Sequence, residues 1–206
     1  LYFLTSTGTT FKSTILHAPY FYLLSSSPSV SSPHYQETVI STLLRTYEGS
    51  GLKSVEVAYL QDLDAVNHLS QTDGRVTFQL SFDNVQQLMD TRSQVMNLIR
   101  ENQKKQEEIS TAFAMETHES QPLETLVDIR EYDVPYLVRT CMDLNIRAGA
   151  WYTVTPTTHS VELTEMDAVT KANPKVLAFD IECTKAPLKF PDANVDSIFM
   201  ISYMVN

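Results

Sequence analysis

The sequence predicts an α/β fold of the α+β type, and three observations support this prediction. Several stretches alternate apolar and polar residues, which is typical of half-buried strands. Between them lie stretches whose apolar residues recur at helical spacing. Of the 206 residues, 43% are hydrophobic and 19% charged, which excludes collagen-like, coiled-coil and wholly disordered proteins.

The first predicted strands lie within the first 24 residues. Residues 1–5 and 10–16 flank a Ser-Thr-Gly-Thr turn and predict a hairpin. Residues 19–24 are mostly aromatic and aliphatic, and they predict a further short strand.

A helix is predicted after the Ser/Pro-rich loop at residues 25–33. Ser32 can act as its N-cap, and Pro33 suits the first helical position. Apolar residues then recur at helical spacing until Gly49 and Gly51, which predict the end of the helix.

Two strands and a second helix follow. Residues 55–59 and 76–82 alternate apolar with polar or small residues, and Asp83 can cap a helix whose apolar stripe runs from residue 85 to 99. The order strand, helix, strand, strand, helix resembles a split βαβ module of the ferredoxin or RNA-recognition type. We expect that module to occupy residues 1–102.

Residues 103–125 are predominantly polar and predict a linker or an extension of the second helix. Their charges are mixed in sign, which favours a solvated helix and loop over an interaction tail. Residues 126–173 are predicted to hold the connecting helix and strands of the N-terminal domain. There, Asp133 can cap a short helix that ends near Asn145, and residues 146–154 alternate as a strand does.

Two acids interrupt the apolar run at residues 176–182. Because side chains alternate along a strand, Asp180 and Glu182 project from the same face, with Cα atoms roughly 6 to 7 Å apart. We expect the strand to be buried, with the acid pair at its carboxyl end.

Two like charges on a buried strand need neutralisation by protons or cations. Mg²⁺ or Mn²⁺ would provide it, because carboxylate oxygens suit these hard cations. A pair of such ions would activate a water and stabilise the leaving 3′ oxygen in phosphodiester hydrolysis. The alternative is that the two acids form a solvated edge or a salt-bridged, purely structural pair.

The apolar run at residues 198–205 predicts a second strand that returns beside the first. An acid pair on a first strand with such a neighbour is the opening of a ribonuclease-H-like nuclease sheet. We therefore expect residues 174–206 to be the start of an incomplete nuclease domain, in a piece cut from a longer protein.

A resemblance to a known family supports this expectation. Residues 176–192 read Val-Leu-Ala-Phe-Asp-Ile-Glu-Cys-Thr-Lys-Ala-Pro-Leu-Lys-Phe-Pro-Asp, and residues 201–205 read Ile-Ser-Tyr-Met-Val. Together they closely resemble the first exonuclease motif of the family B DNA polymerases, in the form typical of eukaryotic epsilon catalytic subunits. Residues 127–136 and 150–152 resemble the segment that joins the N-terminal and exonuclease domains of that family.

The resemblance implies a segment from the N-terminal part of a replicative, leading-strand DNA polymerase with 3′→5′ proofreading. Asp180 and Glu182 match the first two catalytic, metal-binding acids of the exonuclease, which would hold Mg²⁺ or Mn²⁺ weakly or not at all in this chain alone. The later exonuclease acids, the polymerase domains, and the zinc and iron–sulfur elements would lie outside this chain, so we expect it to be inactive alone. Cys183 stands where the family usually has Thr.

The resemblance also implies partners and a location. We expect primer–template DNA, nucleotides, accessory subunits of the epsilon complex and the sliding clamp as partners, in the nucleus and without a membrane. No apolar run approaches the roughly 20 residues that span a bilayer.

Composition leaves two alternatives to the exonuclease assignment. The chain could be a noncatalytic scaffold with a structural acid pair, or a nucleic-acid-binding module in which Tyr20, Phe21 and Tyr22 stack on bases. The net charge of −10 argues against a broad basic surface, and core packing of these aromatic residues is the better interpretation. The two cysteines are too few for a disulfide framework, and the five histidines show no metal-site spacing.

Overall fold

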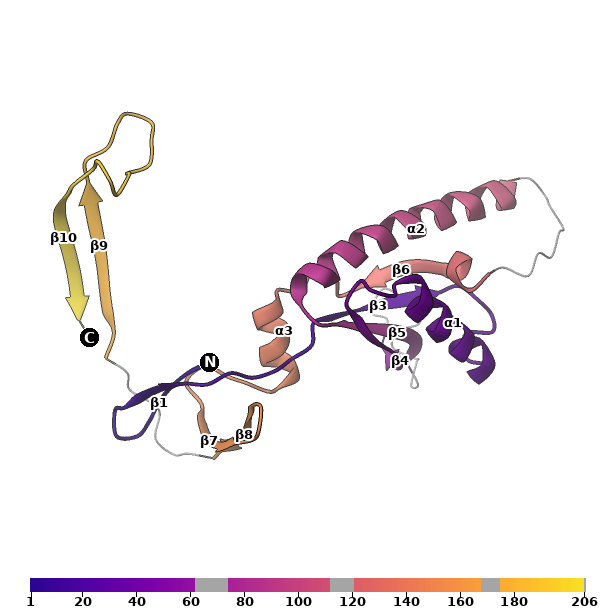
Figure 1. Cartoon of the computed structure of the whole chain (residues 1–206), viewed down its shortest axis with the longest axis horizontal. Helices are drawn as coiled ribbons and strands as arrows, with labels where there is room; N and C mark the ends of the chain where they lie inside the picture. The colour runs from indigo at the N-terminus through magenta and orange to yellow at the C-terminus, as the bar shows by residue number, and fades with distance from the viewer. Residues whose placement is uncertain (62–73, 112–120, 168–174, 206) are drawn as a thin grey trace. The chain divides into compact units, whose positions relative to one another are not determined.

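The computed structural model describes residues 1–61, 74–111, 121–167 and 175–205 (Figure 1). The chain mixes helices and strands, as predicted, and divides into two compact units, residues 1–146 and 147–206. Within the described ranges, no helix has the length and apolar character needed to cross a membrane.

The first unit is built on a four-stranded antiparallel sheet with the strand order β4-β5-β3-β6. Its strands are β3 (Tyr20–Ser25), β4 (Leu52–Leu60), β5 (Arg75–Phe82) and β6 (Leu126–Arg130). The apolar residues of β5 are buried, as its alternating pattern predicts. Its polar Thr77 is also 2% exposed, and the Thr77 hydroxyl donates a hydrogen bond to the Ala58 carbonyl oxygen at 2.9 Å.

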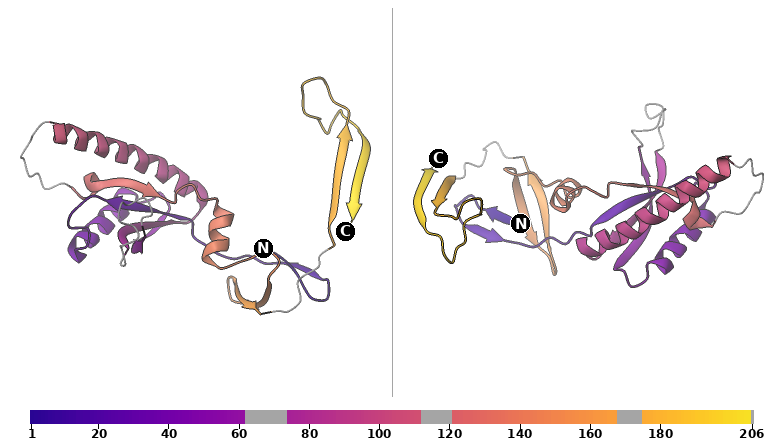
Figure 2. Two further views of the ribbon diagram at one scale, coloured as in Figure 1. Left: turned by 180° about the vertical axis from the view of Figure 1, so that it is seen from behind. Right: turned by 90° about the horizontal axis from the view of Figure 1, so that it is seen from above.

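Two helices complete the core of this unit. They are α1 (Pro33–Thr46) and α2 (Val85–Thr111), and α2 runs beside β6 in both views of Figure 2. One hydrophobic cluster joins the helices to the sheet, and its fully buried members are Phe21, Leu23, Val39, Leu43, Phe78, Leu80, Phe82, Val95 and Leu126. The amphipathic stripes predicted from sequence therefore face a common core.

The helix caps agree only in part with the predictions. Ser32 is the N-cap of α1 and Pro33 its first residue, as predicted, although the Ser32 side chain makes no capping hydrogen bond. For α2 the predicted cap Asp83 is wrong: Asn84 precedes the first helical residue, and its Oδ1 accepts a hydrogen bond from the Gln87 amide at 3.0 Å.

The next helix, α3 (Tyr136–Asp143), also begins later than predicted. Pro135 occupies its N-cap position, so Asp133 is not the cap. At its other end Asn145 has a φ of 50°, which confirms the predicted helix stop, because Asn tolerates the left-handed region.

α2 continues past residue 102 and is tied to the strand that follows. The Asn102 side chain is 2% exposed and donates hydrogen bonds to the carbonyl oxygens of Leu123 and Leu126, at 2.7 and 2.9 Å. These carbonyls belong to the short 3-10 helix η1 (Pro122–Thr125) and to β6. Residues 112–120 of the predicted linker lie outside the described residues.

Three hairpins make up the remaining strands of the ranges that the structure describes. The predicted N-terminal hairpin forms from β1 (Tyr2–Leu4) and β2 (Thr10–Lys12). The second unit holds β7 (Trp151–Pro156) with β8 (Val161–Met166), and β9 (Leu177–Cys183) with β10 (Ile198–Val205). β7 starts later than the predicted residue 146, because Arg147 to Ala150 form a turn in which Gly149 has a φ of 81°.

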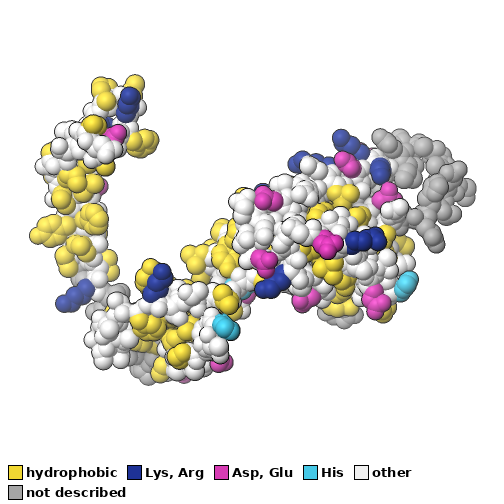
Figure 3. Space-filling model, viewed as in Figure 1, with side chains coloured by type: hydrophobic (Ala, Val, Ile, Leu, Met, Phe, Trp, Pro, Cys, Tyr) yellow, Lys and Arg dark blue, Asp and Glu magenta, His cyan; other side chains and the backbone are white. Residues whose placement is uncertain are grey.

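The β9–β10 hairpin confirms the predicted returning strand but not its burial. Leu177, Phe179 and Ile181 are 60%, 67% and 42% exposed, and hydrophobic side chains line the hairpin in Figure 3. A two-stranded ribbon leaves both faces open unless another layer packs on them. The apolar side chains of β9 therefore form a surface that would be buried only if another layer of structure packed on it.

Candidate metal centre

The acid pair lies near the carboxyl end of β9. Asp180 and Glu182 are separated by one residue in a regular strand, so their side chains project from the same face, as predicted. Across the ladder, Asp180 pairs with Ser202 and Glu182 with Met200 on β10. The structure thus brings together the two acids and places a small hydroxyl residue opposite the first.

Local backbone contacts orient the first acid. The Asp180 Oδ1 atom accepts a hydrogen bond from the backbone N–H of Ile181 at 2.9 Å. Both acids are exposed, contrary to the expected burial, because neither face of the ribbon is covered within the described chain. Water solvates and screens their charges, so the argument that burial forces a cation onto the pair does not apply to this chain by itself.

The donor chemistry of the pair nevertheless fits a hard divalent cation. Mg²⁺ is usually held by one or two carboxylates, with waters and substrate phosphates completing its octahedron. Asp180 and Glu182 supply that number of carboxylates on one face. No group of three or more His, Cys, Asp or Glu residues gathers among the described residues, so the pair provides part of a coordination sphere.

The residues next to the acids form a closed loop between the two strands. Thr184 follows the end of β9, and its amide donates to the carbonyl oxygen of Ser197 at 2.9 Å. In return the Ser197 amide donates to Thr184 Oγ1 at 2.8 Å. Cys183, which precedes them, is half-buried and carries a free thiol.

The aromatic strand near the N-terminus serves the core. Phe21 and Tyr22 on β3 are 0% and 7% exposed, so their rings cannot stack on bases, and packing is the correct interpretation. Two of the five histidines, His68 and His118, lie outside the described residues.

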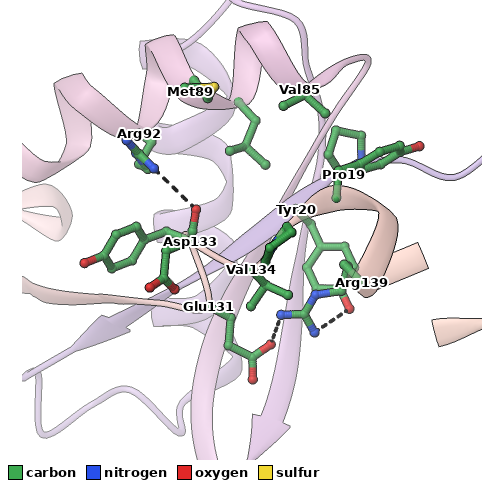
Figure 4. Close-up of a pocket in the computed structure, with 13 residues that line it drawn as sticks. Pro19, Tyr20, Val85, Met89, Arg92, Glu131, Asp133, Val134 and Arg139 are labelled. Atoms are coloured by element: carbon green, nitrogen blue, oxygen red, sulfur yellow. Dashed lines mark hydrogen bonds and ion pairs between the residues drawn. The ribbon is translucent and has the colours of Figure 1, made fainter. Parts of the chain in front are cut away.

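Sequence reasoning missed a polar cluster in the first unit. His17 Nε2 lies 2.9 Å from Asp143 Oδ2, and the Tyr20 hydroxyl donates to the same carboxylate oxygen at 2.8 Å. Arg139 forms an ion pair with Glu131 and donates to the Tyr20 hydroxyl at 3.3 Å, as Figure 4 shows. His17 and Tyr20 are over 100 residues from Asp143 in the sequence, so no local spacing could have indicated these contacts.

The cluster shifts the ionisation of its members. Burial, followed by the hydrogen bond to Asp143, raises the pKa of Tyr20 well above its usual value. Burial alone would lower the pKa of Arg139, but the hydrogen bond and charge of Glu131 outweigh it and raise that pKa. Glu131 has a φ of 56°, in the left-handed region that residues other than Gly rarely adopt.

A cavity of about 210 Å³ adjoins this cluster. It lies between the start of β3, the first turns of α2 and the turn before α3, and Figure 4 shows its lining. Neither Asp180 nor Glu182 lines it. The cavity is smaller than the roughly 300 to 1,000 Å³ of typical small-molecule sites.

Comparison with known proteins places the acid pair in a wider context. Residues 127–206 match the family model described as DNA polymerase family B, exonuclease domain. The chain is 44% identical over 206 residues to the DNA polymerase epsilon catalytic subunit of Eremothecium gossypii. It is 38% identical over 212 residues to that of Arabidopsis thaliana and 37% identical over 207 residues to that of Saccharomyces cerevisiae. Each match covers 100% of this chain and 9% of the relative.

Proposed function

Because the chain belongs to family B of the DNA polymerases and corresponds to a segment of an epsilon catalytic subunit, we propose that it is part of a replicative DNA polymerase with a proofreading 3′→5′ exonuclease. The similarity over the whole chain supports this proposal. The chain spans about a tenth of the length of those relatives, so polymerisation and the complete exonuclease belong to the longer protein.

The exonuclease part of the proposal rests on one observation, that Asp180 and Glu182 project from the same face of β9. Their carboxylates would hold Mg²⁺ or Mn²⁺ on the acid-bearing face of β9. When bound, the metal supplies an activated water and stabilises charge on the leaving 3′ oxygen. The chain itself contributes the orientation of the acids: the strand sets their spacing, and the Ile181 N–H holds one oxygen of Asp180.

We also propose a domain arrangement. We assign residues 1–102 to a split βαβ module of the ferredoxin or RNA-recognition type, and the antiparallel neighbours β4, β5 and β3 with helices α1 and α2 support this assignment. β6, from the connecting segment, adds a fourth strand to the same sheet. Residues 103–125 would link it to the connecting elements at 126–173. Residues 174–206 would begin a ribonuclease-H-like exonuclease domain, with β9 and β10 as its first strands.

The proposed function also defines partners and a location. The longer protein would act on primer–template DNA and nucleotides in the nucleus, together with accessory subunits and the sliding clamp. Zinc and an iron–sulfur cluster would be held outside this chain.

A noncatalytic scaffold is the second candidate function. The exposure of both acids favours it, as does the lack of a third metal-ligating group near them in the described part of the chain. In that case the acid pair would be a solvated surface feature.

Single substitutions in the full-length polymerase decide between the two. Asp180→Asn and Glu182→Gln should each lower Mg²⁺-dependent release of the 3′ nucleotide by about 10³-fold, because each removes a charged metal ligand while keeping its size. Glu162→Gln, on the exposed β8 strand, is the matched control and should retain full activity. Unchanged exonuclease rates in the first two variants would support the scaffold.

A further inference from the structure

The loop before α1 contains two serines that each precede a proline. Ser27 is followed by Pro28 and Ser32 by Pro33, in a stretch where six of the eight residues from 25 to 32 are serine. Both serines are half-buried and both prolines are exposed. A serine followed by proline is the minimal sequence that proline-directed protein kinases modify, and surface loops are accessible to such enzymes. The loop therefore holds two candidate phosphorylation sites.

Hydrogen bonding distinguishes the two serines. The Ser27 hydroxyl accepts a hydrogen bond from the Ser29 amide at 3.2 Å, and its carbonyl accepts one from the Val30 amide, also at 3.2 Å. These bonds close a turn around Pro28. The backbone of Ser32 is extended, with a φ of −76° and a ψ of 127°, and its hydroxyl makes no capping hydrogen bond in the described part of the chain. Ser32 is therefore the serine whose hydroxyl is free to react.

Ser32 also lies at the start of α1, where a phosphate would be stabilised. The first amides of a helix have no acceptor within the helix and carry the positive end of the helix dipole. Because Pro33 has no N–H, the first such amides of α1 are those of His34 and Tyr35. The first turn of α1 holds no Asp or Glu that would repel a phosphate. A phosphate on Ser32 would therefore accept charge-assisted hydrogen bonds from these two amides.

Tyr35 fixes the position of this turn. Its hydroxyl lies 2.7 Å from Ser25 Oγ and 2.5 Å from Thr125 Oγ1. Ser25 and Thr125 are 5% and 8% exposed, so this buried cluster of hydroxyls anchors the start of α1 to β3 and η1. The amides that would bind the phosphate are thus in place before any modification.

We propose that Ser32 is a phosphorylation site of a proline-directed kinase and that the phosphate caps α1. In the reaction Ser32 Oγ attacks the γ-phosphorus of ATP, and the Oγ–P bond forms as the bond from that phosphorus to the β–γ bridging oxygen breaks. ADP leaves, and the hydroxyl proton passes to a base of the kinase. The product adds about 1.5 to 2 negative charges at pH 7. The inference goes beyond the proposed function, because it concerns α1 and requires neither acid of β9.

Phosphate mapping on the full-length polymerase tests the site. The protein is incubated with a mitogen-activated protein kinase and ATP, and mass spectrometry locates the phosphate. Ser32 should be modified in the wild type and in Ser27→Ala, the matched control that removes the other site. Pro33→Ala keeps the acceptor hydroxyl without the recognised proline and should reduce phosphate at Ser32 by at least about tenfold. Phosphate at Ser27 alone, at neither serine, or undiminished in Pro33→Ala would overturn the proposal.

Hydrogen exchange in the same protein tests the cap. After phosphorylation the amides of His34 and Tyr35 should exchange about two- to fivefold more slowly than in the unmodified polymerase, because the phosphate accepts their hydrogen bonds. Ser32→Ala treated with the same kinase is the control and should show no slowing. Unchanged or faster exchange at these amides in the phosphorylated protein would overturn the proposal.

Discussion

At Tyr20 a phenol lies between a cation and an anion. Its hydroxyl donates to Asp143 and accepts from Arg139, and the guanidinium also sits 4.9 Å from the ring centre. Because one side chain of β3 contacts two of α3, this contact fixes the short helix to the sheet. The hydroxyl can donate to Asp143 only while the phenol keeps its proton.

The first unit should therefore lose stability in alkali. The folded state raises the pKa of Tyr20, and burial also raises the pKa values of Tyr22 and Tyr47, while in the unfolded chain tyrosines titrate near 10. Above about pH 10 the unfolded state binds fewer protons, so the free energy of unfolding falls as pH rises. Urea unfolding at pH 9, 10 and 11 should show this fall, and Tyr20→Phe should make it shallower. An equal slope in the variant would contradict a role for Tyr20.

The ion pair of Arg139 should contribute measurably to stability. The Arg139 side chain is 10% exposed but that of Glu131 is 42% exposed, so Arg139→Met should cost about 1 to 3 kcal/mol, less than breaking a fully buried pair. Lys105→Met breaks an exposed pair with Glu124 and should cost less than about 1 kcal/mol. Denaturant unfolding of both variants measures the difference, and equal costs would show that burial of Arg139 is unimportant.

Residue-level features differ in how far sequence predicts them. The shared face of Asp180 and Glu182 follows from strand periodicity alone, so it was predictable. Their exposure was not, because burial depends on which layers cover the sheet. The contact between His17 and Asp143 joins residues that only the tertiary fold brings together.

At the scale of elements, two neighbouring polar residues, Asp83 and Asn84, precede α2, and only Asn84 caps the helix. Asn84→Ala should destabilise the first unit by about 1 kcal/mol, because it removes the hydrogen bond to the Gln87 amide. Asp83→Ala should change stability by less than about 0.5 kcal/mol, because Asp83 lies outside the cap position. Thermal unfolding of both variants is the measurement, and a larger loss for Asp83→Ala would refute the assignment of the cap.

In the strained turn of the β9–β10 hairpin, a substitution is expected to raise stability, not to lower it. Leu188→Gly should stabilise the turn by about 1 kcal/mol, since Gly adopts a φ of 62° without steric strain. Hydrogen exchange of the Lys189 amide, which closes the turn, should slow in the variant. Faster exchange would mean that Leu188 itself stabilises the loop.

Element types were more predictable than element ends. Alternation identified β5, and helical spacing identified α1 and α2, because each has one face against the shared core. The start of β7 was misplaced because a local turn at Gly149 interrupts an otherwise alternating pattern. The starts of α2 and α3 differed by one or two residues from those expected, because Asn84 rather than Asp83 caps α2 and Pro135 takes the N-cap position of α3.

At the scale of the whole molecule, the two units differ in how they bury apolar surface. The first unit encloses a core between its sheet and two helices. In the second, one face of the β9–β10 hairpin is entirely apolar while the other carries the acids, and both are exposed. We expect further layers of the longer polymerase to cover the apolar face, because an isolated hairpin is marginally stable in water.

This arrangement predicts that the chain is inactive alone. Two carboxylates provide part of a coordination sphere, so residues 1–206 should not degrade a primer in Mg²⁺ or Mn²⁺. A labelled primer incubated with the purified chain should remain intact. Metal-dependent shortening from the 3′ end, at a rate that scales with chain concentration, would show that the described residues suffice.

We propose above all that Asp180 and Glu182 hold the metals of the proofreading exonuclease in the longer protein. The most direct measurement compares 3′ nucleotide release with primer extension in one preparation of the full-length polymerase carrying both Asp180→Ala and Glu182→Ala. We predict that nucleotide release is abolished and that extension proceeds at the wild-type rate. Unchanged nucleotide release, or loss of both activities together, would contradict the claim.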